Sequence, residues 1–137
     1  MHLVDTSVWV WARRCSDLRA ELADHAAADA IAICHPVLFE LVYSARNADE
    51  YRYLRDAYET YPFVAVDDAV WARALDVNEG MARQGGLHHR QVRQPDLVIA
   101  AAAELAGIPV LHYDADYDRI AAVTGQETRW VRPRGSL

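Results

Sequence analysis

Acidic residues stand where side chains can reach the end of a predicted sheet. Asp5 directly follows an apolar run that begins at His2, and Asp114 and Asp116 follow the apolar residues 110–113. In an open parallel sheet the carboxyl ends of the strands share one edge, and ligands bind in the crevice outside it. The sequence therefore predicts that these carboxylates face a common crevice.

Two further acids belong to predicted helices that open at the same edge. Glu40 lies about one turn into a helix that begins at His35-Pro36, in an apolar segment where an unpaired glutamate is rarely found. Asp96 lies in the first turn of an apolar helix over residues 95–107. Each acid has an ordinary explanation by itself, such as a helix cap, a favourable helix dipole or an acidic turn. Their joint placement on separate elements favours a shared site.

A cluster of carboxylates predicts a bound cation. Carboxylates within a few ångströms repel one another, and burial raises their pKa values further unless a positive charge lies between them. Ligation by oxygen alone fits Mg²⁺ or Mn²⁺, and the absence of a Cys/His ligand pattern argues against structural zinc. Such an ion can hold a phosphate and activate water. The expected chemistry is an in-line displacement at a phosphate.

The composition describes one folded domain over residues 1–137. The chain is 53% hydrophobic and 25% charged, which is typical of globular proteins. Its formal charge of −6 argues against binding nucleic acid through overall basicity. Cys15 and Cys34 fit no metal spacing and are expected to be free thiols. No leader or membrane-spanning segment is recognisable, so we expect a cytoplasmic protein without a membrane partner.

Apolar periodicity and capping residues predict alternating strands and helices. The expected strands are residues 2–5, 30–34, 63–66, 110–113 and 128–131. The expected helices cover residues 6–14, 16–28, 36–47, 50–61, 67–83, 95–107 and 114–125, with an exposed loop at 84–94. This alternation predicts an α/β fold with three layers, in which helices cover both faces of a small, mainly parallel sheet of four to five strands.

Three segments resemble the PIN-domain family, most closely the VapC-type toxins of bacterial toxin–antitoxin pairs. They are "LVDTSVWV", "PVLFELVYSA" and "DLVIAAAAELAGIPVLHYDADYDRI", and together they span nearly the whole chain. The resemblance implies an endoribonuclease that depends on Mg²⁺ or Mn²⁺, a homodimer and a small VapB-like antitoxin as partner. It implies that the catalytic and metal-binding acids are Asp5, Glu40, Asp96 and Asp114, with Asp116 as a further metal ligand. Thr6 or Ser7 matches a supporting hydroxyl, whereas His112 departs from the threonine of many relatives.

An acidic protein that cleaves RNA needs a local positive rim, because phosphate contacts supply much of the affinity for nucleic acid. The candidate substrate contacts are Arg13, Arg46, Arg90, Arg93 and His112. Trp9 and Trp11 could stack bases, but we expect them to pack in the core or against a partner. Tyrosines of the helix 50–61 are likewise expected to serve packing or a partner groove.

The predicted reaction is hydrolysis of RNA by metal-activated water, and two alternatives stay open. The first is a PIN-like module that binds RNA or a protein without cleavage. The second is a Mg²⁺-dependent phosphotransfer domain, although the first strand is followed by "DTS" rather than D-x-D and the chain contains no lysine for a phosphate-sensing role.

Overall fold

Four short parallel strands form the centre of the molecule. A computed structural model describes all residues from 1 to 137. The strands are β1 (His2–Val4), β2 (Ile31–Ala32), β3 (Val110–His112) and β4 (Thr128–Trp130). Their order in the sheet is β2-β1-β3-β4, and all three pairings are parallel. The predicted α/β class with a parallel central sheet is therefore confirmed, with four strands.

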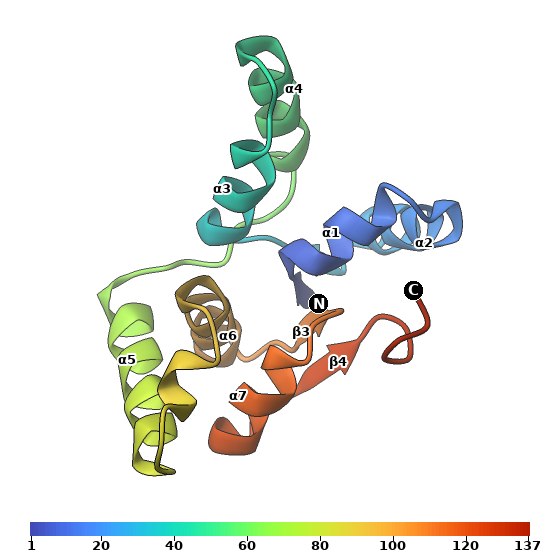
Figure 1. The fold of residues 1–137 in the computed structure, drawn as a ribbon. Helices are drawn as coiled ribbons and strands as arrows, with labels where there is room; N and C mark the ends of the chain where they lie inside the picture. Colours follow the sequence, from blue (N-terminus) through green and yellow to red (C-terminus); the bar gives the residue numbers. More distant parts are fainter.

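Seven α-helices and one 3₁₀ turn connect these strands. They are α1 (Thr6–Ala12), α2 (Ser16–Ala27), α3 (His35–Tyr43), α4 (Ala48–Tyr58), α5 (Asp68–Arg83), η1 (His88–Arg90), α6 (Gln94–Ala106) and α7 (Asp116–Thr124). In Figure 1 the strands run between α1 and α2 on one side and α5, α6 and α7 on the other. This arrangement forms the three expected layers.

Helix α6 is the central element of the core. Its residues 96–103 are all buried, which matches the uninterrupted apolar sequence of this helix. It contacts α3, α5 and α7 as well as β3. Gly107 ends the helix in the left-handed conformation, with φ of 72°, where a residue without a side chain is least strained. The buried helix thereby fixes the position of its own first turn, which contains Asp96.

The segment 63–66, predicted as a strand, forms only a single bridge between Ile33 and Phe63. That prediction was wrong, because the consecutive apolar side chains of this segment pack on the edge of the core without a second bridge to a strand. The helix predicted over 36–47 ends at Tyr43, and Asn47 instead caps α4 by accepting a hydrogen bond from the Glu50 amide. Asparagine is a preferred N-cap residue, which accounts for the start of α4 at Ala48.

Helices α3 and α4 form an arm that extends from the rest of the molecule (Figure 1). No residue of α4 is buried. The base of the arm is held by Trp9, whose ring lies 5.3 Å from that of Tyr58 and 5.2 Å from that of Tyr61. Trp9 therefore packs in the core, as expected. None of the helices combines the length and apolar character needed to cross a lipid bilayer.

Candidate metal centre

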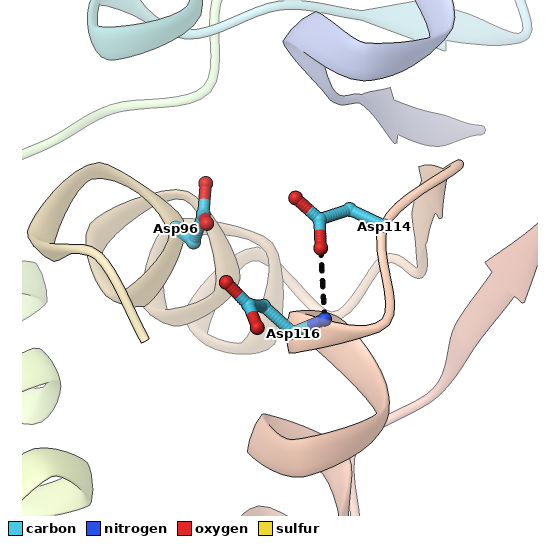
Figure 2. Close-up of side chains that lie close together, drawn as sticks. All are labelled: Asp96, Asp114 and Asp116. Atoms are coloured by element: carbon cyan, nitrogen blue, oxygen red, sulfur yellow. Dashed lines mark hydrogen bonds between the residues drawn. The ribbon is translucent and has the colours of Figure 1, made fainter. Parts of the chain in front are cut away.

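Three carboxylates converge beside the carboxyl end of β3. Oxygen atoms of Asp96, Asp114 and Asp116 all lie within 4.8 Å of one another. Figure 2 shows that Asp96 comes from the start of α6, Asp114 from the turn after β3 and Asp116 from the first residue of α7. The Asp116 amide donates a hydrogen bond of 2.9 Å to Asp114 Oδ1, which fixes the shape of this turn. The three side chains can thus offer oxygen ligands to one ion.

Asp5 is buried at the end of β1, and both of its oxygens accept hydrogen bonds. Oδ2 accepts from the amide of Ser7 at 2.9 Å and from its hydroxyl at 2.5 Å. Oδ1 accepts from the hydroxyl of Tyr117 at 2.5 Å. Ser7 Oγ also accepts from the amide of Tyr113, so one hydroxyl links Asp5 to the strand end at β3. Asp5 is therefore the N-cap of α1 and a fixed carboxylate of the site.

Glu40 extends from α3 and is held by two side chains. Its Oε1 accepts a hydrogen bond of 2.9 Å from the Thr6 hydroxyl. A guanidinium nitrogen of Arg93 lies 3.5 Å from Glu40 Oε2 and 3.4 Å from Asp96 Oδ1. The Arg93 side chain remains 63% exposed, so it reaches the acids from the solvent side. The expected positive charge among the carboxylates is thus supplied in part by this chain.

Asp96 experiences the strongest electrostatic strain in the site. Its side chain is 1% exposed, and its Oδ2 atom has no hydrogen-bond partner. Burial, together with the charges of Asp5, Asp114 and Glu40, raises the pKa of Asp96 to about 7, while Arg93 acts in the opposite direction. The other three predicted catalytic acids therefore all act on Asp96, although Asp5 and Glu40 lie outside the group of three described above.

This donor set fits a hard divalent cation. A buried carboxylate oxygen without a partner is costly, and an ion that contacts it would satisfy the atom and offset the repulsion among the acids. Burial and the neighbouring Asp114 also raise the pKa of Asp116. Since every donor in the cluster is an oxygen, Mg²⁺ or Mn²⁺ matches it better than a softer metal.

The arginines predicted to contact substrate lie in different places. Arg93 contacts Glu40 and Asp96. Arg90 is exposed in η1, three residues earlier in the sequence than Arg93. Arg46 is 86% exposed and pairs with Glu50 on the arm. Arg13 lines a groove between α1, α2 and α4. None of Arg13, Arg46 and Arg90 forms an ion pair with the carboxylates of the site, so Arg93 is the predicted arginine that the structure places on the site.

His112, predicted as a substrate contact, has a fully buried side chain and is not open to a ligand in this structure. Its Nδ1 accepts a hydrogen bond of 3.2 Å from the amide of Asp114. The ring centroid lies 4.9 Å from that of Tyr117 and 5.0 Å from that of Trp130. Burial lowers the pKa of His112, so the neutral ring is favoured. The residue supports the backbone that carries Asp114.

Tyr117 is the residue of the site that sequence reasoning did not assign. It is the fourth residue of the "DADY" motif at 114–117, which contributed to the family resemblance without a role for its hydroxyl. The structure buries the ring completely and directs the hydroxyl to Asp5, 112 residues away in the chain. A buried tyrosine hydroxyl usually finds a polar partner, and an acid at a predicted strand end was available as a signal.

Comparison with known proteins agrees with this geometry, because residues 2–123 match the family model described as the PIN domain. The chain belongs to the PIN-domain family. It is 48% identical over 134 residues to Ribonuclease VapC18 of Mycobacterium tuberculosis, covering 98% of this chain and 97% of that protein.

Solved structures of complexes share the fold of this PIN domain. VapBC2 from Rickettsia felis, bound to a DNA fragment from its promoter, matches with a TM-score of 0.74 at 15% identity, over 94% of this chain and 98% of that chain. VapBC-5 from Mycobacterium tuberculosis, described as a member of a family of toxin–antitoxin systems, matches with a TM-score of 0.61 at 25% identity, over 96% and 97% of the two chains.

The raised pKa of Asp96 predicts a pH-dependent stability of the metal-free protein. Because this pKa is about 7 in the fold and near 3.8 in the unfolded chain, the folded state binds more protons between these values. Its free energy of unfolding should therefore fall with rising pH in this window, by roughly 1.4 kcal/mol per unit at most. Asp96→Asn should remove this contribution, so its stability relative to the wild type should rise from pH 4 to pH 7. Urea unfolding in EDTA measures the difference, and a constant difference would contradict it.

The hydrogen bond from Tyr117 to Asp5 predicts a stability change of its own. Tyr117→Phe keeps the buried ring but leaves a buried carboxylate oxygen without its donor, which costs about 1–3 kcal/mol. Urea unfolding at pH 8 in EDTA should detect this loss. Tyr113→Phe is a matched control, because the Tyr113 hydroxyl accepts from the amide of the terminal residue Leu137 instead. Equal losses in both variants would argue against a special role for Tyr117.

Proposed function

We propose that this PIN domain is an endoribonuclease toxin that uses Mg²⁺ or Mn²⁺ held by Asp5, Glu40, Asp96 and Asp114, with Asp116 in support. The observation that carries the proposal is the unpartnered Oδ2 atom of buried Asp96, in a group of carboxylate oxygens from three residues. The similarity to a protein named as a ribonuclease, over nearly the full length of both chains, supports RNA as the substrate.

Hydrogen-bonding side chains hold the acids that are proposed to bind the metal. Hydrogen bonds from Ser7 and Tyr117 hold Asp5, and the Thr6 hydroxyl holds Glu40. A divalent ion in this site supplies positive charge against the phosphodiester and lowers the pKa of water. Burial and the neighbouring acids raise the pKa of Asp96 at the start of α6, so such positive charge would favour its ionised form.

Arginines at the exposed side of the site are suited to the RNA backbone. Arg93 reaches Glu40 and Asp96 from solvent, and the exposed Arg90 precedes it on η1. Their positive charges can meet the phosphates on either side of the cleaved bond, where phosphate contacts contribute much of the affinity. These local positive charges would attract the anionic substrate although the whole protein has a formal charge of −6.

A small antitoxin is the partner that we propose, together with a homodimer of this chain in the cytoplasm. The solved VapBC complexes with the same fold support an antitoxin as partner. An apolar groove of about 360 Å³ between α1, α2 and α4, lined by Trp9, Leu22 and Tyr53 among others, offers a surface for such a segment. The contact of Arg93 with Glu40 and Asp96 also illustrates that a guanidinium fits among the acids, as a basic antitoxin side chain would.

The carboxylates should be required for RNA cleavage. Asp96→Asn removes the charge of the buried ligand with little change in shape, so we expect at least about a hundredfold loss of cleavage rate with Mn²⁺ present. Asp118→Asn is the matched control, since the Asp118 carboxylate accepts from Trp130 Nε1 outside the cluster. Gel analysis of a labelled single-stranded RNA measures both rates. Wild-type cleavage by Asp96→Asn would refute the assignment of the site.

Binding of the metal should be measurable without RNA. Titration calorimetry of the EDTA-treated and dialysed protein with Mn²⁺ at pH 8 should detect binding that Asp96→Asn weakens and Asp118→Asn leaves unchanged. An ion at a hundred times its dissociation constant stabilises the fold by about 2.7 kcal/mol, so the melting temperature should rise in parallel. Absence of Mn²⁺ and Mg²⁺ binding to the wild type would favour the alternative of a binding module without catalysis.

A further inference from the structure

A pocket adjoins the carboxylate site through Glu40, and its other wall residues take no part in the contacts described above. Its volume is about 530 Å³, and its walls come from α3, the segment before α5, α5 itself and the start of α6. The side chain of Glu40 forms part of its wall, so the pocket and the acids share a residue. Anything bound at the acids therefore lies next to this opening.

Aromatic side chains from two helices line the pocket and are exposed. Trp71 on α5 is 51% exposed, and Phe39 on α3 is 62% exposed. His35, at the start of α3, adds a third ring to the wall and is itself supported by Phe63 at a centroid distance of 4.5 Å. Large aromatic faces left open on separate elements around one opening are suited to a flat apolar ligand.

Polar groups at the same pocket have no partner within the chain. Gln94 and His35 are exposed, and the side-chain amide of Gln94 and the imidazole of His35 make no hydrogen bond to other protein groups. Gln94 is the first residue of α6 and lies two positions before Asp96. An amide both donates and accepts, so it can pair with the edge of a ligand whose face lies on the aromatic rings.

We propose that this pocket binds one nucleobase of the RNA next to the cleaved phosphodiester, an inference that rests on the proposed function. A base is flat, neutral and edged with donors and acceptors, and it is covalently joined to the phosphate that the acids would hold. Proteins recognise single-stranded RNA by stacking bases on aromatic side chains and pairing with their edges. The only charged residue on the wall is Glu40, which disfavours a phosphate inside the pocket.

Protein ligands fit the pocket less well. An apolar segment from an antitoxin or a second copy of the chain could cover Trp71 and Phe39, but it would leave the polar groups of Gln94 and His35 without partners. Buried polar groups without hydrogen bonds are costly. A nucleobase satisfies the aromatic walls and the polar edge together, and its place beside Glu40 follows from the connectivity of the RNA.

Removal of the indole tests the proposal through RNA binding. The probe is a fluorescent single-stranded RNA pool of random sequence, and binding is measured by anisotropy in the Asp96→Asn background, where cleavage is not expected. Trp71→Ala should weaken binding roughly five- to 150-fold, the range that base stacking on aromatic side chains gives. Trp71→Phe, which keeps a ring, should retain most of the affinity. Leu75→Ala is the control, as Leu75 lies one turn further along α5, is 69% exposed and does not line this pocket.

Sequence preference provides a second readout in proteins with an intact Asp96. Sequencing of the new 5′ ends made from the random pool with Mn²⁺ should show a base preference beside the cut that Trp71→Ala weakens and Leu75→Ala preserves. Wild-type binding and preference in Trp71→Ala would overturn the nucleobase pocket while the nuclease function remained. The nucleobase pocket would also be overturned if Trp71→Ala changed only self-association, measured by light scattering, or only the affinity for an antitoxin.

Failure of the proposed function gives a different pattern. In that case the wild type cleaves no RNA with Mn²⁺ or Mg²⁺. RNA binding that still depends on Trp71 would then support the pocket, whereas binding that is independent of Trp71, or no binding at all, would overturn it. Circular dichroism of Trp71→Ala checks its fold, and Trp71→Phe provides a conservative variant at the same position.

Discussion

Repulsion among carboxylates is the constraint on which the organisation of this molecule depends. The fold brings acids from β1, α3, α6 and the β3–α7 turn to one end of a parallel sheet, and it buries Asp96 among them. Burial and like charges both oppose ionisation, so the charged form of the site is unfavourable without a compensating positive charge. Such strain is common at functional sites, where stability is reduced in favour of activity.

Neighbouring side chains limit this cost without removing it. Three hydroxyls, from Thr6, Ser7 and Tyr117, donate to the acids that have room for them, and Arg93 supplies a positive charge from solvent. Asp96 receives no such donor at Oδ2. Hydrogen bonds therefore fix the positions of Asp5 and Glu40, whereas the charge of Asp96 in the first turn of α6 is left without a donor at Oδ2.

The surroundings of the site differ in character from the site itself. Arg93 reaches the acids from solvent, and an aromatic pocket with unpaired polar groups lies beside Glu40. An RNA strand likewise places charged phosphates next to flat, neutral bases. The arm of α3 and α4 leaves further apolar surface exposed, which is consistent with a protein that functions with partners.

Local sequence patterns determined the strands at 2–4 and 110–112, the apolar helix α6 and the acids at the ends of these elements, because periodicity and caps act over a few residues. These patterns wrongly predicted a strand at 63–66, since a short run of apolar residues is equally compatible with packing outside a strand. Only tertiary structure decided that Tyr117 donates to Asp5 across 112 residues, that His112 is buried and that Arg93 lies on the acids. Those contacts depend on the relative placement of whole elements, and local preferences do not encode that placement.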